Sequence, residues 1–155
     1  ERKEDNLDAH TIVVGYDGSP DAKVALEEAI THVHEDGIVH VVTVHNPKLT
    51  SYNTEMLPDE FRQAVDPEAA DRMRLQDAEL RLRSAGVRFE SHLMWGRPAA
   101  EILELAAKVD ADLIVLGSRG LGSVQRLVLG SVSTRVAAHA HTSTLIVHDE
   151  TVAAA

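Results

Sequence analysis

The stretch that decides the fold is L-I-V-L-G-S-R-G, residues 113–120, and after nine more residues the chain reads Gly130-Ser131. Four consecutive apolar residues are typical of a strand buried on both faces. Glycines end that strand, and a loop of glycine and serine leads toward a new helix. Proteins commonly bind a phosphate chain in this way without a large positive charge. The stretch therefore indicates a nucleotide-binding site.

Glycine and serine recur through this loop in a pattern that suits an anion. Glycine lets the backbone take positive φ and come close to phosphate oxygens, so that amide N–H groups face the ligand. Serine hydroxyls can donate from the sides. A helix that begins near Gly130 adds its free N–H groups and the positive end of its dipole. We expect several weak donors to converge on one anion.

The acidic residues of the chain avoid the same region. With Asp+Glu 25 in 155 residues, an even spread would place roughly six acids between Leu113 and His148. That window contains none, although it keeps Arg119, Arg126 and Arg135. The absence of acids has two interpretations. A buried strand, a small-residue loop and a core helix exclude carboxylates in any case, or the region binds an anion. We favour the anion site.

Length and composition indicate one domain. The 155 residues are enough for one full core, and we expect a single domain over residues 11–150, with a polar N-terminal tail at residues 1–10 and a C-terminal tail at residues 151–155. Aromatic residues make up 3% of the chain, so the core must consist mainly of Val, Leu, Ile and Ala. Such a core suits parallel strands that helices cover.

The charge and the absence of cysteine argue against several classes of protein. A formal net charge of −10 disfavours a nucleic-acid surface, which needs clustered Lys and Arg. With Cys 0, a disulfide framework, Cys-ligated zinc and thiol catalysis are excluded. The sequence shows no charged-then-apolar leader and no apolar run of membrane-spanning length, so we expect a cytoplasmic protein with no membrane partner.

Strands and helices are expected to alternate along the chain. The sequence predicts strands at residues 11–16, 38–44, 87–95, 112–116 and 144–148. It predicts helices from Pro20 to Gly37, from Asp66 to Gly86, after Pro98 and after Gly130, with Ser19 as the first N-cap. Residues 46–66 show no clean period, and we expect a mobile excursion there with a short helix near residues 58–65.

This alternation predicts an α/β fold, in which a mostly parallel sheet has right-handed crossovers and helices on both faces. Such sheets bind ligands beyond the carboxyl ends of their strands, where the strand order reverses. That edge would carry Asp17-Gly18-Ser19, Val44 and residues 117–122. We therefore expect the ligand site at this edge.

Taken together, these motifs resemble the universal stress protein family. The resemblance rests on Gly117-x2-Gly120-x9-Gly130-Ser131, on V-G-Y-D-G-S at residues 14–19 and on Gly96-Arg97-Pro98, and it extends from Thr11 to Asp149. It implies a three-layer, Rossmann-like, five-stranded parallel sheet of order 3-2-1-4-5. It also implies adenine-nucleotide binding and a homodimer formed through the last strand, Thr144, Leu145, Ile146, Val147 and His148. Pairing two such strands would cover an exposed sheet edge with two-fold symmetry.

The resemblance also implies site residues. Members that bind ATP keep all three spaced glycines and a following Ser or Thr, as this chain does, so it implies ATP, with Mg²⁺ as a candidate companion. Asp17 and Val44 would contact the adenosine, with Gly18 and Ser19 beside them. The phosphates would be lined by Gly117, Ser118, Arg119, Gly120, Gly122, Gly130, Ser131, Val132 and Ser133.

Asp17 has two interpretations. It could be a turn former that only accepts hydrogen bonds from nearby backbone. It could also be a ligand group that accepts from the nucleotide or helps to hold Mg²⁺. We favour the ligand role, because Asp17 follows the first strand at the expected ligand edge.

The motifs of other nucleotide-binding proteins and of serine hydrolases do not fit this sequence. The sequence lacks Gly-x4-Gly-Lys-Ser/Thr and Gly-x-Ser-x-Gly, and its glycine spacing differs from the dinucleotide fingerprint. The pairs His32-x-His34 and His139-x-His141 would point to nearly opposite sides of a helix, so we do not expect a structural metal there.

These observations favour an ATP-binding stress or signalling regulator, whose nucleotide sets a conformation or the choice of partner. No residue is assigned as a catalytic base, although nearby arginines keep slow hydrolysis open. One alternative is an adenine-nucleotide α-hydrolase-like enzyme or slow ATPase. Another is a nucleotide-independent dimeric adaptor, or a cyclic AMP sensor that uses the same edge.

Overall fold

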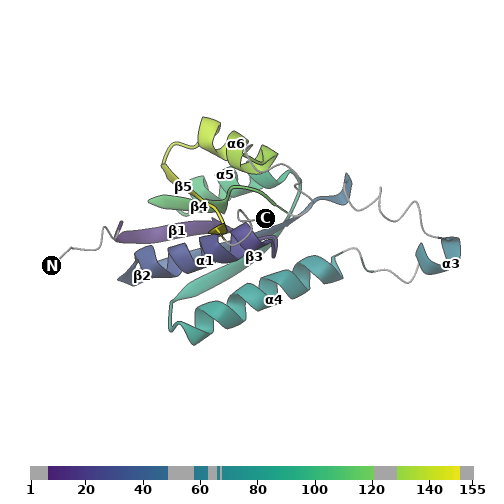
Figure 1. The fold of residues 1–155 in the computed structure, drawn as a ribbon, viewed down its shortest axis with the longest axis horizontal. Helices are drawn as coiled ribbons and strands as arrows, with labels where there is room; N and C mark the ends of the chain where they lie inside the picture. Colours follow the sequence, from purple (N-terminus) through teal and green to yellow (C-terminus); the bar gives the residue numbers. More distant parts are fainter. Residues whose placement is uncertain (1–6, 49–57, 63–65, 67, 121–128, 151–155) are drawn as a thin grey trace.

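The five strands that the structure describes form one parallel sheet. The structure is a computed structural model, and it describes residues 7–48, 58–62, 66, 68–120 and 129–150. The strands are β1 (Ala9–Gly15), β2 (Val33–His45), β3 (Phe89–Trp95), β4 (Leu113–Gly117) and β5 (Ser143–Val147). They are all parallel and lie in the order β3-β2-β1-β4-β5 (Figure 1). The predicted fold class and strand order are confirmed.

Helices cover both faces of this sheet. The described helices are α1 (Pro20–His32), α3 (Asp59–Arg62), α4 (Ala69–Ser84), α5 (Pro98–Lys108) and α6 (Ser131–His139). Figure 1 shows α1 and α4 on one side of the sheet and α5 and α6 on the other. Within this described set, no helix combines the length and the apolar character needed to cross a membrane.

The helix boundaries follow local signals that the sequence contains. Ser19 caps α1, because its hydroxyl accepts a 3.2 Å hydrogen bond from the Ala22 N–H, and Pro20 takes the first helical position. Gly86 follows α4 with φ +70, a conformation that glycine adopts without strain. Gly130 is the N-cap residue of α6. These three predicted boundaries are confirmed.

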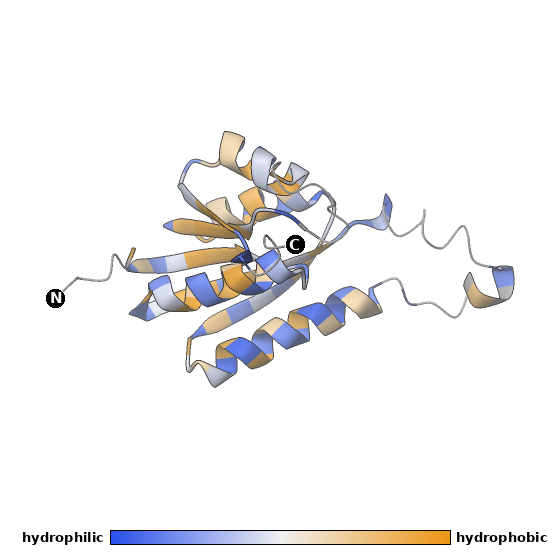
Figure 2. Cartoon of the chain, in the orientation of Figure 1, coloured by the Kyte–Doolittle hydropathy of each residue, from blue (hydrophilic) through white to orange (hydrophobic). Residues whose placement is uncertain are grey.

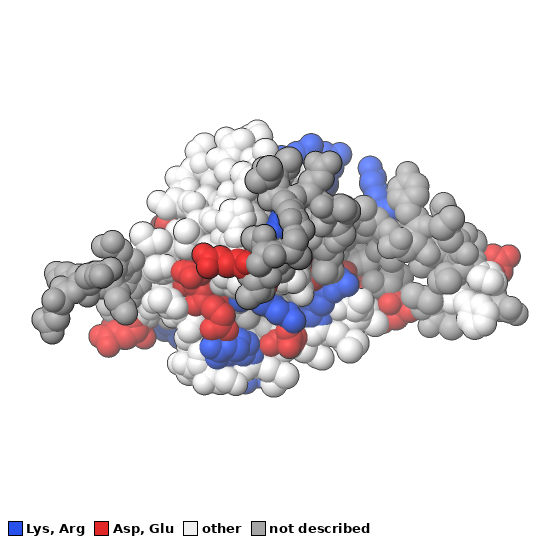
Figure 3. Space-filling view, viewed as in Figure 1, with Lys and Arg blue, Asp and Glu red and all other residues white. Residues whose placement is uncertain are grey.

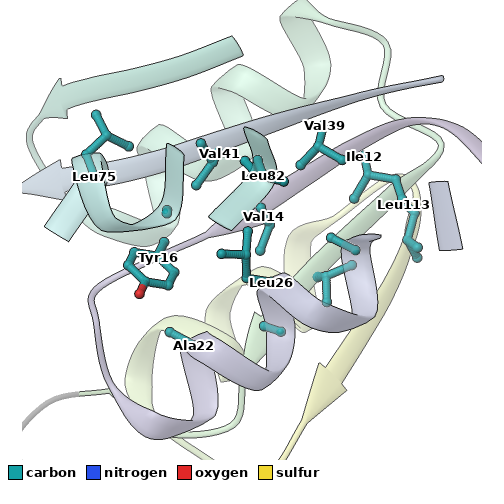
Figure 4. Packing of buried hydrophobic residues seen from close by; sticks show 14 of the residues in the cluster. Ile12, Val14, Tyr16, Ala22, Leu26, Val39, Val41, Leu75, Leu82 and Leu113 are labelled. Carbon is teal, nitrogen blue, oxygen red and sulfur yellow. The ribbon is translucent and has the colours of Figure 1, made fainter. Parts of the chain in front are cut away.

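Two apolar cores lie on the two faces of the sheet, as the alternation of side chains along a strand requires. Ile12 and Val14 face α1 and α4, while Val13 between them belongs to the core under α5 and α6. Figure 4 shows Leu26 of α1 and Leu82 of α4 packing against the first of these cores. In Figure 2 the central strands are mostly hydrophobic, whereas α4 alternates between apolar and polar residues. The central part of the sheet is therefore buried on both faces.

The first helix ends earlier than the sequence predicts. α1 stops at His32, and Val33 is already extended, with φ −72 and ψ 132. The pairing of β1 with β2 then shifts register between Ala9↔Val33 and Thr11↔Ile38. A Cβ on Gly37 would lie 2.8 Å from the His10 carbonyl oxygen and 2.9 Å from that of His34. The prediction that Gly37 ends α1 is wrong, since the glycine permits a close backbone approach inside β2.

Candidate functional site

The loops that leave β1 and β4 touch at the carboxyl edge of the sheet. A Cβ placed on Gly120 would lie 2.6 Å from Asp17 Oδ2, so the Asp17 side chain lies directly against this glycine. The other carboxylate oxygen of Asp17 accepts a 2.9 Å hydrogen bond from the Ser19 N–H. Asp17 therefore shapes its own turn, and it also faces the loop after β4.

A buried carboxylate at the start of α1 holds this region together. Asp21 is 4% exposed, and its Oδ2 accepts from the Ser118 hydroxyl at 2.6 Å and from the Arg119 N–H at 3.1 Å. Its Oδ1 accepts from the Asp149 N–H at 2.8 Å. The Arg119 guanidinium Nε lies 3.7 Å from Oδ2. One carboxylate thus joins α1 to the residues that follow β4 and β5.

The Asp21 environment favours the ionised form. Burial raises the pKa of its carboxyl group, but the hydrogen bonds from Ser118, Asp149 and Arg119 and the charge of Arg119 lower it more. The net result is a pKa below the ordinary value of 3.8. Asp21 is not among the sequence-predicted site residues. The available signal was its helical spacing, because Asp21 and Ala25 are four residues apart and share the buried stripe of α1.

A second set of contacts ties the loop after β4 to the start of α6. The Ser118 carbonyl oxygen accepts from the Gly130 N–H at 2.6 Å and from the Ser133 hydroxyl at 3.0 Å. Ser133 also donates to the Gly130 carbonyl at 3.0 Å. Both serine side chains are buried, at 1% and 2% exposure for Ser118 and Ser133. Their hydroxyls therefore donate within the protein and position the backbone.

The first turn of α6 presents donors toward this edge. Gly130 has φ −62 and ψ 162, and no side chain among the described residues caps the helix. The first turn contains no acidic residue, and Ser131 is exposed at the first helical position. The N–H groups of Ser131, Val132 and Ser133 start a nine-residue helix beside Ser118. A helix start of this kind attracts an anion.

The structure does not bring every sequence-predicted residue to this point. Val44 lies in β2, paired with Met94, and packs against the core under α5. Gly117 approaches α1 closely, since a Cβ on it would lie 2.7 Å from Asp21 Cβ. Gly122 lies outside the described residues. Gly18 has φ +77 and lies next to the Arg74 side chain.

An open hollow of about 360 Å³ lies on the α1 and α4 side of Asp17. It is lined by Asp17, Gly18, Lys23, Met73, Arg74 and Asp77. A neighbouring hollow of about 230 Å³ shares Lys23 and Asp77 with it. Figure 3 shows acidic and basic side chains interspersed over the part of this face where α1 and α4 lie. The hollow therefore offers charges of both signs next to Asp17.

Hydrogen bonds order the floor of these hollows. The Tyr16 hydroxyl donates to Asp77 Oδ2 at 2.6 Å, and burial together with the Asp77 carboxylate raises the pKa of Tyr16. Arg74 donates to Asp71 Oδ1 at 2.7 Å, and Asp71 Oδ2 lies 2.8 Å from the buried His45 Nδ1. α4 is thereby fixed to the carboxyl ends of β1 and β2. The sequence interpretation did not assign these groups to the site.

Comparison with known proteins identifies the family. The sequence model of the universal stress protein family matches residues 9–148. The chain belongs to this family. A universal stress protein of Thermus aquaticus is 38% identical to it over 143 residues, which are 88% of this chain and 97% of that protein.

Solved structures of universal stress proteins share the fold. One of them, a universal stress protein in complex with cAMP, is 29% identical with a TM-score of 0.65, and the match covers 91% of this chain and 98% of that one. A family member from Arabidopsis thaliana with AMP bound is 19% identical with a TM-score of 0.68, covering 94% of this chain and 95% of that one. At that identity the likeness shows the common architecture.

Proposed function

We propose that this universal stress protein binds an adenine nucleotide at the carboxyl edge of β1 and β4 and acts as a cytoplasmic regulator through conformation and partner choice. The observation that carries the proposal is the start of α6. Its first turn has no side-chain cap within the described chain and lies beside the loop that contacts Asp17. An anion at such a helix start replaces the missing cap.

The proposal assigns a role to each part of the site. The N–H groups of Ser131, Val132 and Ser133 and the Ser131 hydroxyl bind phosphate, and glycines keep the approach open. Asp21 positions Ser118 and Arg119 by accepting their hydrogen bonds. The adenosine lies toward Asp17, where the neighbouring hollow begins. When a metal accompanies the nucleotide, Asp17 is its candidate ligand, because hard cations prefer carboxylate oxygens.

ATP and cAMP are the two candidate ligands of this site. The spacing of Gly117, Gly120 and Gly130 with a following serine resembles that of ATP-binding members, which favours ATP. The 29% identical relative was solved with cAMP, which favours a cyclic nucleotide. Mass spectrometry of the nucleotide released from freshly purified, heat-denatured protein identifies the natural ligand. Release of no nucleotide, together with no heat on titration with ATP or cAMP, contradicts the proposal.

A charge substitution at the start of α6 tests the position of the phosphates. Ser131→Glu places a carboxylate where the helix dipole favours it, so the fold is retained, but this carboxylate repels a phosphate. We expect nucleotide affinity to fall by about tenfold or more, which corresponds to about 1.4 kcal/mol. Ala100→Glu is the matched control, because it adds the same charge at an exposed position in the first turn of α5. Equal loss in both variants, or in neither, places the phosphates elsewhere.

The reaction products distinguish a regulator from an enzyme. A regulator leaves bound ATP intact over many minutes, whereas an α-hydrolase-like enzyme releases AMP and pyrophosphate. A slow ATPase would release ADP instead. Incubation of the purified protein with ATP, followed by chromatography of the nucleotides, separates these outcomes.

We further propose that β5 pairs with the same strand of a second copy. β5 is an edge strand, and edge strands are normally covered or paired. The Val147 carbonyl accepts from the Ser118 N–H, so the backbone of Val147 faces β4, and that of Ile146 faces outward. Ile146→Pro removes only an outward N–H group, and we expect monomers in sedimentation experiments. A dimeric Ile146→Pro protein, or a monomeric wild type, overturns this assignment.

A further inference from the structure

Two histidines and a glutamate meet on the sheet well away from the carboxyl edge of β1 and β4. The parallel register of β2 and β3 pairs His40 with Glu90 and Val42 with His92. Because side chains two apart on a strand share a face, Glu90 and His92 stand together next to His40. His40 is five residues before the carboxyl end of β2 at His45, which corresponds to roughly 16 Å along the strand.

The ligating atoms have the spacing of a metal site. His40 Nδ1 lies 3.0 Å from His92 Nε2 and 3.6 Å from Glu90 Oε2. Each of the three residues offers an atom within 4.8 Å of the atoms of the other two. Two ligands at about 2.1 Å from a tetrahedral Zn²⁺ ion lie about 3.4 Å apart. The side chains therefore need only small movements to surround one ion.

We propose that His40, Glu90 and His92 form a binding site for a divalent transition-metal ion, with Zn²⁺ as the best-matched ion. Two imidazoles and one carboxylate are a set that zinc uses when a fourth position is left to water. Imidazole ligands also disfavour Mg²⁺ and Ca²⁺, which prefer oxygen. This site is independent of the nucleotide proposal, since it shares no residue with it.

The surroundings allow an ion to enter and to be held. The His40 side chain is 8% exposed, whereas that of Glu90 is 62% exposed, so the cluster has a fixed inner ligand and an open outer one. Burial lowers the pKa of both His40 and His92, which favours the neutral rings that a metal ion needs as ligands. Lys108, the last residue of α5, contributes a positive charge that also lowers the pKa of His92. That charge opposes a cation and limits its affinity.

Without a metal, His40 and His92 would simply form a hydrogen bond between two rings, one donating and one accepting. A bound ion would instead link the edge strand β3 to β2 and stabilise the fold according to its concentration and affinity. The two possibilities differ in the part played by Glu90, because a ring-to-ring hydrogen bond does not need its carboxylate.

Calorimetric titration of the metal-free protein with Zn²⁺ tests the proposal. We expect one equivalent to bind to the wild type, and Glu90→Gln and His92→Gln each to weaken this binding by about tenfold or more. His139→Gln is the matched control, an exposed histidine on α6 whose loss should leave the affinity unchanged. Absence of binding overturns the proposal, as does binding by Glu90→Gln that equals wild-type binding, because the carboxylate would then not be a ligand; equal binding by His92→Gln would assign the zinc to other residues.

A second variant tests the site by a gain of affinity. Lys108→Gln removes a nearby positive charge from an exposed position, and we expect Zn²⁺ to bind roughly twofold to fivefold more tightly at low salt. Cobalt substitution gives an independent readout, since Co²⁺ in a tetrahedral nitrogen and oxygen site absorbs strongly in the visible range. A Co²⁺ spectrum unchanged by His92→Gln contradicts the proposal.

Discussion

Ser118 donates a 2.6 Å hydrogen bond from its hydroxyl to the buried carboxylate of Asp21, and the two residues are 97 positions apart in the chain. Asp21→Asn replaces one accepting oxygen with an NH₂ group that faces N–H or O–H donors. We expect the free energy of unfolding to fall by about 2–4 kcal/mol. Urea denaturation measures this loss. The control is Asp36→Asn, an exposed position, which should change stability by less than about 0.5 kcal/mol.

Low pH should remove the contribution of Asp21 to the stability of the folded protein. Its pKa is lowered in the folded protein and is about 3.9 when the chain is unfolded. A depressed folded pKa adds stability that is fully present above the unfolded value and is lost as the pH falls through the folded value. We therefore expect the stability difference between wild type and Asp21→Asn to shrink below about pH 4. A difference that stays constant from pH 7 to pH 2 would contradict this assignment.

Gly37 and Gly86 should differ in how well they tolerate asparagine. A Cβ on Gly37 would lie within 2.9 Å of two carbonyl oxygens, so Gly37→Asn should cost about 2 kcal/mol or more. Gly86 has φ +70 and open space around it, and asparagine tolerates that conformation. Gly86→Asn should cost less than about 1 kcal/mol. Thermal unfolding of both variants checks the contrast, and a well-tolerated Gly37→Asn would restore Gly37 as a helix end.

Gly120 and Asp17 should be coupled in nucleotide binding. A methyl group on Gly120 would lie 2.6 Å from Asp17 Oδ2 and would displace that carboxylate. We expect Gly120→Ala to weaken nucleotide binding by about tenfold in the wild type and by less than about twofold in an Asp17→Ala background. Calorimetry on the four proteins of the cycle gives the coupling energy. Additive effects would mean that Asp17 and the loop act separately.

Much of the fold follows from local patterns that the sequence displays directly. The apolar run at Leu113–Leu116, the cap at Ser19 and the glycine after α4 each depend on neighbouring residues only, and all three hold in the structure. The end of α1 does not follow from a local pattern, because the extended conformation of Val33 is fixed by pairing with Ala9 in β1. A contact between strands leaves no trace in the sequence near Gly37.

The candidate site shows the same division. The glycines and the start of α6 could be predicted from spacing, but the side-chain assignments could not. Ser118 and Ser133 look like donors to a ligand, yet Ser118 donates to Asp21, 97 positions away, and Ser133 donates to the Ser118 main-chain oxygen. The cluster of His40, Glu90 and His92 likewise depends on the register of β2 and β3, which only the folded sheet defines.

The hydrogen bond from the Asp149 N–H to Asp21 has a consequence for regulation. The segment after β5 and the loop after β4 are both anchored to the same carboxylate, so a displacement of Asp149 reaches that loop through Asp21. If the protein pairs through β5 and binds a nucleotide beside that loop, as proposed above, subunit association and nucleotide occupancy are thermodynamically linked, and each must alter the other by the same factor. The measured nucleotide affinity would then change with protein concentration, because the fraction of paired subunits changes with it.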